Sequence, residues 1–178
     1  RIALLQEVSP NLSKLAFLIL RPYWEGRWSA LFGNVCQEMG LTAIGAPIDA
    51  GAGEADYRAV FAAAASEHAD GLYITPVLEN VIHRRLIAEL ALSAGMASVS
   101  FYRDSVEAGG LMSYGPDLAD IYRRAAGYVD RILKGADPAE MPFQQPVKFD
   151  FVLSVVTASA LGLTIPPTLL AVADDVFE

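Results

Sequence analysis

Strand-sized apolar runs alternate with amphipathic, helix-length runs over roughly the first hundred residues of the chain. The periodicity predicts four pairs of elements, each a helix followed by a strand, with short connectors between them. The helices are expected at 1–8, 27–40, 54–69 and 78–95, and the strands at 14–20, 41–48, 71–75 and 97–101. Parallel strands need crossovers, and crossovers cover both faces of the sheet. The pattern therefore predicts an α/β fold with a Rossmann-like (flavodoxin-like), doubly wound parallel sheet.

The loops at the carboxyl ends of these strands are the expected place for a ligand, because backbone groups and loop side chains converge there. They lie at 21–26, 49–56, 75–80 and 101–110. None carries a nucleotide motif: the stretch GAGEAD has neither the glycine spacing of a dinucleotide fingerprint nor the lysine of a P-loop. Helix capping by Asp49 or Asp56 explains this stretch better. No cofactor is predicted.

Composition and residue inventory exclude several classes of function. The formal net charge is −8 and the pI is about 4.7, so no basic surface is expected for nucleic acid. No apolar run approaches the roughly 20 residues that cross a bilayer. Cys36 is interpreted as a buried small hydrophobe rather than a redox group. His68 and His83 stand without ligand-spaced partners, and no serine has a G-x-S-x-G setting, so neither a metal site nor an enzyme is predicted.

A strand at 111–115 follows a glycine pair near the middle of the chain. Gly109 and Gly110 can adopt a positive φ or let another backbone approach closely. Pro116 and Asp117 come next, and Asp117 is the expected N-cap of a helix. The sequence therefore predicts a strand that turns sharply into a helix.

That helix is expected to run to Lys134 and to end at Gly135. Beyond it we expect an extended, proline-marked crossing and one more strand. The chain should then end in a short helix stopped by Pro166 and Pro167.

Four motifs in this later part of the chain carry a family resemblance. They are GGLMSYG at 109–115, YVDRILKG at 128–135, PFQQP at 142–146 and ALGLTIPP at 160–167. Together they resemble the ABC-transporter substrate-binding protein family that includes tryptophan- and tyrosine-binding members. The opening run RIALLQEVSPNLSKLAFLI is similar to the start of that family's second lobe, so the resemblance covers essentially the whole chain.

Two stretches depart from the family's usual pattern. Residues 21–28 read RPYWEGRW where similar members have a loop containing Asn-Pro. Residues 154–158 read SVVTA where the usual sequence is NLKTA. The ligand is therefore not identified by the resemblance.

The resemblance implies a type I periplasmic-binding-protein architecture, in which two Rossmann-like lobes clamp a solute. Residues 1–108 would be the second lobe, and residues 109–178 a crossover strand-helix segment with a lobe-completing tail. The first lobe would precede residue 1, together with a signal peptide or lipid anchor. The implied partners are a small-molecule solute and the membrane permease of the transporter, and the implied location is periplasmic or otherwise extracytoplasmic.

A binding protein needs a concave site with an apolar or aromatic wall and a few oriented polar groups. Tyr23 and Trp24 are candidates for a stacking wall, and Thr75 and Ser113 for hydroxyl contacts. Glu79 suits an ammonium group and Arg103 a carboxylate. The candidate ligand-binding residues are Tyr23, Trp24, Thr75, Glu79, Tyr102, Arg103, Ser113 and Tyr114.

Structural roles explain the same residues without a ligand. Tyr23 and Trp24 would then cover a sheet edge, and Trp28 would belong to the helix core. Glu79 would favour a helix N-terminus, and Arg103 would form a solvated pair with Asp104. Tyr114 would pack in the crossover.

The sequence thus predicts a non-enzymatic solute-binding component of an ABC-type uptake transporter, with an amino acid or a related aromatic or carboxylate compound as ligand. A ligand-sensing domain of a regulator or sensor kinase is the alternative, and a flavodoxin-like enzyme is a more distant one. One architecture hosts all three.

The resemblance implies that the segment from GGLMSYG through the following helix completes the first lobe, so its apolar side chains should face a partner outside this chain. In the isolated chain the partner would be a second copy, in a homodimer, or the missing lobe. The residues concerned are Leu111, Ile121, Tyr122, Ala125, Tyr128 and Ile132.

Overall fold

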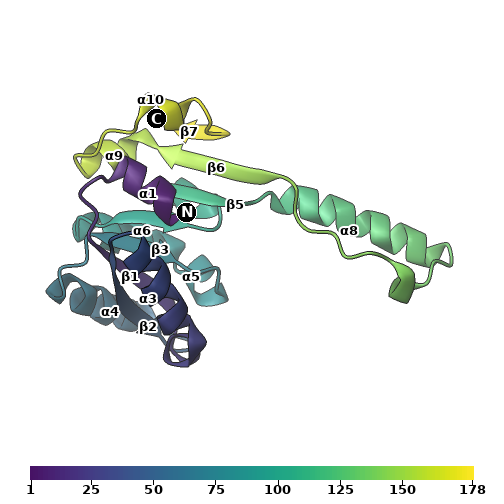
Figure 1. Cartoon of the computed structure of the whole chain (residues 1–178), viewed down its shortest axis with the longest axis horizontal. Coiled ribbons are helices and arrows are strands. Elements are labelled where there is room, and N and C mark those ends of the chain that lie inside the picture. Colours follow the sequence, from purple (N-terminus) through teal and green to yellow (C-terminus); the bar gives the residue numbers. More distant parts are fainter.

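Seven strands form one sheet in the computed structural model, which describes all of residues 1–178 (Figure 1). Their spatial order is β2-β1-β3-β4-β5-β6-β7. The first five run parallel, β6 is antiparallel to β5, and β7 is parallel to β6. The predicted α/β class with a doubly wound, mostly parallel sheet is confirmed. The strands are β1 (Lys14–Leu20), β2 (Thr42–Ile48), β3 (Gly71–Ile74), β4 (Ala97–Ser100), β5 (Met112–Pro116), β6 (Phe149–Ser154) and β7 (Asp175–Phe177).

The burial of each strand follows from its place in the sheet. In β1 the five residues between Lys14 and Leu20 are all buried, as a strand covered on both faces requires. In the edge strand β2 burial alternates along its second half, which is typical of a strand with one exposed face. The apolar run of β1 thus fits an interior position in the sheet, between β2 and β3.

Helices cover both faces of the sheet and divide the core into two layers. Leu5 of α1, Cys36 of α3 and Leu169 of α10 pack on one face. Tyr57 of α4 and Ile87 of α6 pack on the other. The helices are α1 (Ile2–Val8), α2 (Arg21–Tyr23), η1 (Trp24–Trp28), α3 (Ser29–Glu38), α4 (Glu54–Ser66), α5 (Leu78–Ile82), α6 (Arg84–Ser93), α7 (Asp104–Glu107), α8 (Leu118–Leu133), η2 (Pro138–Glu140), α9 (Val155–Ala160) and α10 (Pro167–Leu170). None is long and apolar enough to cross a membrane.

Three local predictions are corrected. The helix expected at 78–95 is interrupted at His83, which separates α5 from α6. The segment expected as a loop at 21–26 is helical, because α2 and η1 continue into α3. The chain does not end in a helix stopped by Pro166 and Pro167: Pro167 begins α10, as proline suits the first helical turn, and β7 follows.

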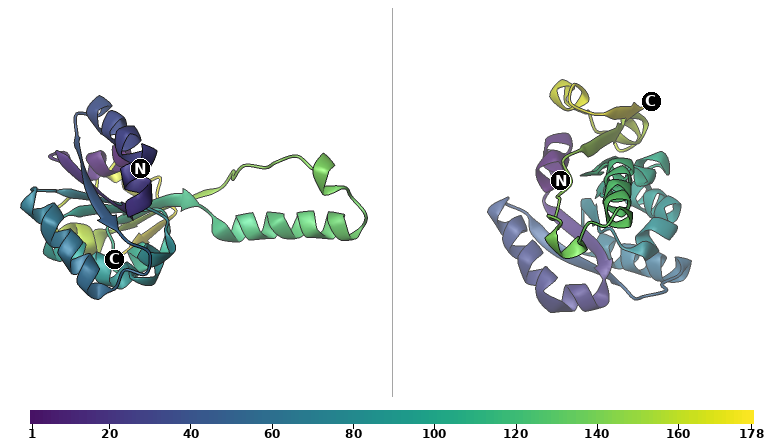
Figure 2. Two further views of the ribbon diagram at one scale, coloured as in Figure 1. Left: turned by 90° about the horizontal axis from the view of Figure 1, so that it is seen from below. Right: turned by 90° about the vertical axis from the view of Figure 1, so that its right-hand side faces the viewer.

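The helix α8 projects away from the sheet with the chain that returns beside it (Figures 1 and 2). We call α8 and the returning residues 134–148 the arm. Asp117 caps α8 as predicted, because its Oδ1 accepts from the Asp120 amide at 3.0 Å. No residue of α8 is buried, and Tyr122 and Leu133 are 73% and 82% exposed. Leu111 is different: it was expected to face a partner, but it is fully buried in the core of this lobe.

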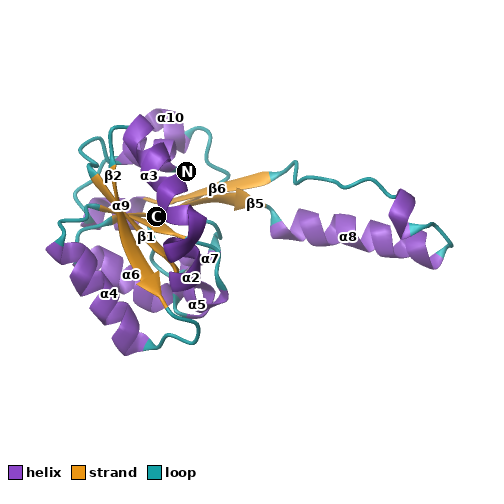
Figure 3. Cartoon of the chain, turned by 60° about the horizontal axis from the view of Figure 1, so that its bottom comes forward, coloured by secondary structure: helices purple, strands orange, loops and turns teal.

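The two strands that lead to the arm pair with each other before they leave the sheet (Figure 3). Among the glycines, Gly115 of β5 has the least room for a side chain, because any Cβ would overlap the carbonyl oxygen of Phe101. Gly109 adopts a φ of 108°, as the glycine pair predicted. The turn chemistry in this stretch therefore lets β5 lie closely against the end of β4.

Replacing Gly115 by alanine should lower the free energy of unfolding by about 1–3 kcal/mol, because the new methyl group meets fixed backbone. Gly127→Ala is the matched control: Gly127 lies in α8 with no atom near its Cβ position, so alanine should stabilise by roughly 0.5–1 kcal/mol. Urea unfolding of both variants measures the difference. Equal stability of the two would contradict the close packing at Gly115.

Candidate functional site

A groove of about 790 Å³ lies at the carboxyl ends of β1 and β3. Ile19 and Leu20 end β1, and Thr75 follows β3 at its floor. The α2–η1 turn supplies one wall, and the N-terminal part of α5 supplies another. The groove therefore lies where ligands of open parallel sheets bind.

Aromatic rings form a continuous wall of this groove. The rings of Trp28 and Phe32 have centroids 5.5 Å apart, and those of Phe32 and Tyr73 are 5.8 Å apart. Phe17 of β1 lies behind them and stacks on Phe32 at 4.2 Å. Phe101, after β4, completes the lining. Such a wall is suited to a planar or apolar ligand, because aromatic side chains offer large, rigid contact area.

A buried hydrogen-bond network fixes the floor of the groove. The Thr75 hydroxyl and the Asn80 amide both donate to the Leu18 carbonyl, at 2.7 and 3.2 Å. The Tyr57 hydroxyl donates to Asn80 Oδ1 at 3.0 Å. Burial raises the pKa of Tyr57, and the negative charge of Glu79 adds to the shift. These bonds hold α5 against the end of β1 and so position the rim of the groove.

Three of the predicted site residues come together in this groove: Tyr23, Thr75 and Glu79. Tyr23 is 51% exposed, so its ring is available to a ligand. The Thr75 hydroxyl already donates to backbone, which leaves it only as an acceptor. Trp24 lies behind the wall, where its ring stacks on Phe17 at 6.1 Å and covers Gly45 of β2.

Tyr102 and Arg103 line a second, smaller hollow of about 350 Å³ at the base of the arm. Arg103 donates to Glu107 Oε1 at 3.1 Å and to Asp175 Oδ2 at 2.8 Å. The hydrogen bond to Glu107 raises the pKa of Arg103, and the bond to Asp175 adds to it. This guanidinium is therefore neutralised within the chain, by partners other than the Asp104 that sequence suggested.

Ser113 and Tyr114 lie on β5, outside the groove. Ser113 is 1% exposed, and its hydroxyl is buried without a hydrogen-bond partner. The Tyr114 ring stacks on Phe149 at 5.7 Å, which joins β5 to β6. Only the Tyr114 carbonyl faces the groove side, where it accepts from Arg1 Nε. Ligand contact by these two residues stays a prediction.

Six aromatic or cationic residues of the groove were not among the predicted ones. Trp28 had been interpreted as helix core, yet it faces the groove. A signal for part of this wall was available, since Trp28 and Phe32 are four residues apart and so share one helix face. The six residues are Arg1, Arg27, Trp28, Phe32, Tyr73 and Phe101.

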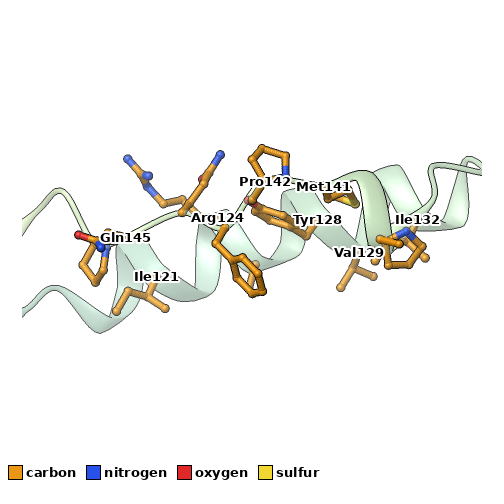
Figure 4. Close-up of a pocket in the computed structure, with 14 residues that line it drawn as sticks. Ile121, Arg124, Tyr128, Val129, Ile132, Met141, Pro142 and Gln145 are labelled. Carbon is orange, nitrogen blue, oxygen red and sulfur yellow. The ribbon is translucent and has the colours of Figure 1, made fainter.

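The arm carries another concave surface of about 790 Å³, between α8 and the returning chain (Figure 4). Ile121, Val129 and Ile132 project from α8 toward this surface. The Tyr128 hydroxyl donates to the Pro142 carbonyl and ties the two segments together. The surface is apolar and open, and it lies away from the strand ends. No group of three or more histidine, cysteine or carboxylate side chains in the chain is arranged to hold a metal ion.

A family model described as ABC transporter substrate binding protein matches residues 58–177, about two thirds of the chain. The chain belongs to the ABC transporter substrate-binding protein family. The family resemblance predicted from the sequence motifs is therefore confirmed. A search of curated proteins finds no match.

Three solved structures share the fold of this family member. A conserved domain protein of Vibrio cholerae O1 biovar El Tor matches with a TM-score of 0.85 at 24% identity, over 98% of this chain and 58% of its own. An ABC domain from Streptococcus pneumoniae in complex with L-Trp matches with a TM-score of 0.86 at 20% identity, over 99% and 59%. The ligand-free, open structure of CD0873, a substrate-binding protein with adhesive properties from Clostridium difficile, matches with a TM-score of 0.72 at 14% identity, over 99% and 58%. This chain thus spans less than two thirds of each.

The base of the arm is held by a pair whose stability should depend on pH. Lys148 Nζ lies 2.8 Å from Asp117 Oδ2, and the Asp117 amide donates to the Lys148 carbonyl at 3.0 Å. The bond from Lys148 lowers the pKa of Asp117, and the Asp120 amide lowers it further. The bond to Asp117 raises the pKa of Lys148. The pair joins the outgoing and returning chains where both leave the sheet.

Because the folded pKa of Asp117 is depressed, its contribution to stability is present above its unfolded pKa of about 4 and is lost as the pH falls through the folded value. The raised pKa of Lys148 keeps its contribution until above about pH 10. Asp117→Asn should therefore lower the melting temperature relative to wild type at neutral pH, and the gap should close on acidification below about pH 4. Thermal unfolding by circular dichroism measures this. Asp130→Asn, in an exposed α8 pair, is the control, and a gap independent of pH for Asp117→Asn would contradict the assignment.

Proposed function

We propose that this chain is part of the non-enzymatic solute-binding component of an ABC-type uptake transporter, and that its groove binds an amino acid or a related aromatic or carboxylate compound. The observation that carries the proposal is the aromatic-walled groove at the carboxyl ends of β1 and β3. Membership of the substrate-binding family supports it. The likeness to a domain in complex with L-Trp is consistent with an aromatic ligand.

We further propose that the arm belongs to the other lobe of a two-lobed protein. The arm's apolar side chains lack a partner in this chain, since no residue of α8 is buried. The chain also spans only 58–59% of the solved relatives that share its fold, which leaves room for a second lobe. A lobe packed on the arm would lie opposite the groove, because the arm leaves the sheet at the edge where the parallel strands have their carboxyl ends. The groove would then be one half of an interlobe cleft.

The partners follow from this role. A small solute would be enclosed when the lobes close, and a membrane permease would receive it. Uptake requires the solute to be captured outside the membrane, so we place the protein in the periplasm or another extracytoplasmic site. The motion would bend the paired chains next to Asp117 and Lys148.

Tyr23→Ala in the full-length protein should weaken binding of an aromatic solute by about 1 kcal/mol or more, because an exposed stacking ring is lost, with little change in melting temperature. Trp24→Ala is the matched contrast: its ring packs on Phe17, so its removal should cost roughly 3 kcal/mol of stability instead. Calorimetric titration with L-tryptophan and L-phenylalanine, and thermal unfolding, measure the two effects. Unchanged affinity in Tyr23→Ala would contradict the proposed site.

The isolated 178-residue chain should self-associate through the arm, because a second copy can cover the apolar face that the other lobe would cover. Ile132→Lys should shift it toward monomer by charging that face. Gly127→Lys adds the same charge where no other atom lies near, and should leave association unchanged. Sedimentation velocity measures the mass. A compact monomer that binds an amino acid tightly would contradict the two-lobe assignment.

A further inference from the structure

Two arginines stand at opposite ends of the aromatic wall without a carboxylate partner. Arg27 lies in η1, where Gly26 departs from helical geometry with a ψ of −140°. Its guanidinium carbon is 5.6 Å from the Trp28 ring centroid, and its side chain makes neither an ion pair nor a hydrogen bond within the chain. Arg27 is exposed and lines the groove.

Arg1 closes the other end of the wall. Its guanidinium carbon lies 4.3 Å from the Phe101 ring centroid, its Nη1 donates to the Tyr73 hydroxyl at 3.0 Å, and its Nε donates to the Tyr114 carbonyl. A guanidinium has five N–H donors, so these two bonds leave three for another acceptor. The side chain is partly buried, oriented by neutral partners, and carries a charge that nothing in the chain neutralises.

The neighbouring cations are neutralised, which sets these two apart. Arg21, on α2 beside the groove, pairs with Asp49 at 2.9 Å, and Arg103 pairs with Glu107 and Asp175. The chain as a whole carries a net charge of −8. An acidic protein that leaves two cations unpaired in one groove concentrates positive potential there.

Glu79 is the only carboxylate that lines the groove, and it does not balance the arginines. Its Oε1 accepts from the Gly51 amide at 3.4 Å, in the loop before α4, so it leans toward the rim. It lies within 4.0 Å of no arginine or lysine nitrogen. With two arginines and one carboxylate in its lining, the groove therefore carries net positive charge beside an aromatic wall.

We propose that the groove takes an aromatic carboxylate of net negative charge, with its ring against the aromatic wall and its carboxylate held by the guanidinium group of Arg1, while Arg27 attracts it from the other end of the wall. This rests on the proposed function and narrows its ligand class, since the groove is lined by two unpaired arginines and by one carboxylate, Glu79, which accepts from the Gly51 amide at the rim. Arg1 is oriented before the ligand arrives, so little side-chain freedom is lost on binding. Its free donors can meet both oxygens of a carboxylate. Arg27, on an exposed turn at the other end of the wall, adds longer-range electrostatic attraction.

A matched ligand series separates the charges. L-phenylalanine, 3-phenylpropanoate and phenethylamine share the same phenylethyl body, but 3-phenylpropanoate lacks the ammonium group and phenethylamine lacks the carboxylate. Calorimetric titration of the full-length protein should show 3-phenylpropanoate binding at least as tightly as L-phenylalanine, and phenethylamine binding about tenfold or more weakly than 3-phenylpropanoate.

Substitutions then locate the anion. Arg1→Gln should weaken the binding of 3-phenylpropanoate by about fivefold or more, Arg27→Gln should weaken it by a smaller factor, and neither should weaken the binding of phenethylamine. Arg85→Gln is the charge-matched control, because Arg85 lies on α6 away from the groove and also makes no ion pair. It should leave the affinity of all three ligands unchanged. Added salt should weaken the binding of 3-phenylpropanoate more than the binding of phenethylamine.

The outcomes distinguish this inference from the proposed function. Tighter binding of L-phenylalanine or phenethylamine than of 3-phenylpropanoate, with Arg1→Gln and Arg27→Gln without effect, would overturn the anionic subsite. If Tyr23→Ala still weakened those ligands, the proposed function would stand. Absence of binding by all three ligands to the wild-type protein would count against both.

Discussion

Burial of β1 on both faces is the constraint on which the rest of the structure depends. An apolar strand of this kind needs helices above and below it, and helices on both faces require parallel strands joined by crossovers. Parallel strands then end at one edge. The groove, its aromatic wall and the root of the arm all lie at that edge because β1, β3 and β5 finish there.

The contents of the groove reflect a division between residues that pack and residues that stay free. Phe17, Trp24 and the Thr75 network are satisfied within the chain and hold the wall and floor in place. Tyr23, Arg1 and Arg27 retain exposed surface or unused donors. A preorganised wall with free groups in front of it favours binding, because the entropy lost in ordering the wall side chains is lost on folding rather than on ligand binding.

The arm differs from the lobe because its side chains are not buried in a core. Its helix is capped, tied to the returning chain and joined to the sheet through the Asp117–Lys148 pair, yet none of its side chains is buried. The cap, the i,i+4 ion pairs and the tie to the returning chain support the helix, while its apolar face still lacks a partner in this chain. The strands β5 and β6 thus connect the sheet to a helix whose apolar face has no partner in this chain, in line with the two-lobe proposal.

The sequence by itself determined the alternation of helices and strands over roughly the first hundred residues, the α/β class, the Asp117 cap and the membership of a binding-protein family. These depend on local periodicity, turn residues and short motifs, which can be recognised without knowing the tertiary contacts. Only the tertiary structure decided that Trp28 rather than Trp24 faces the groove, and that Pro167 begins a helix followed by β7. It also decided that Arg103 is neutralised by Asp175, 72 residues away, while Arg1 and Arg27 are not. Residues distant in the chain decide which aromatic rings are covered and which charged groups form ion pairs. A local sequence pattern therefore cannot predict either.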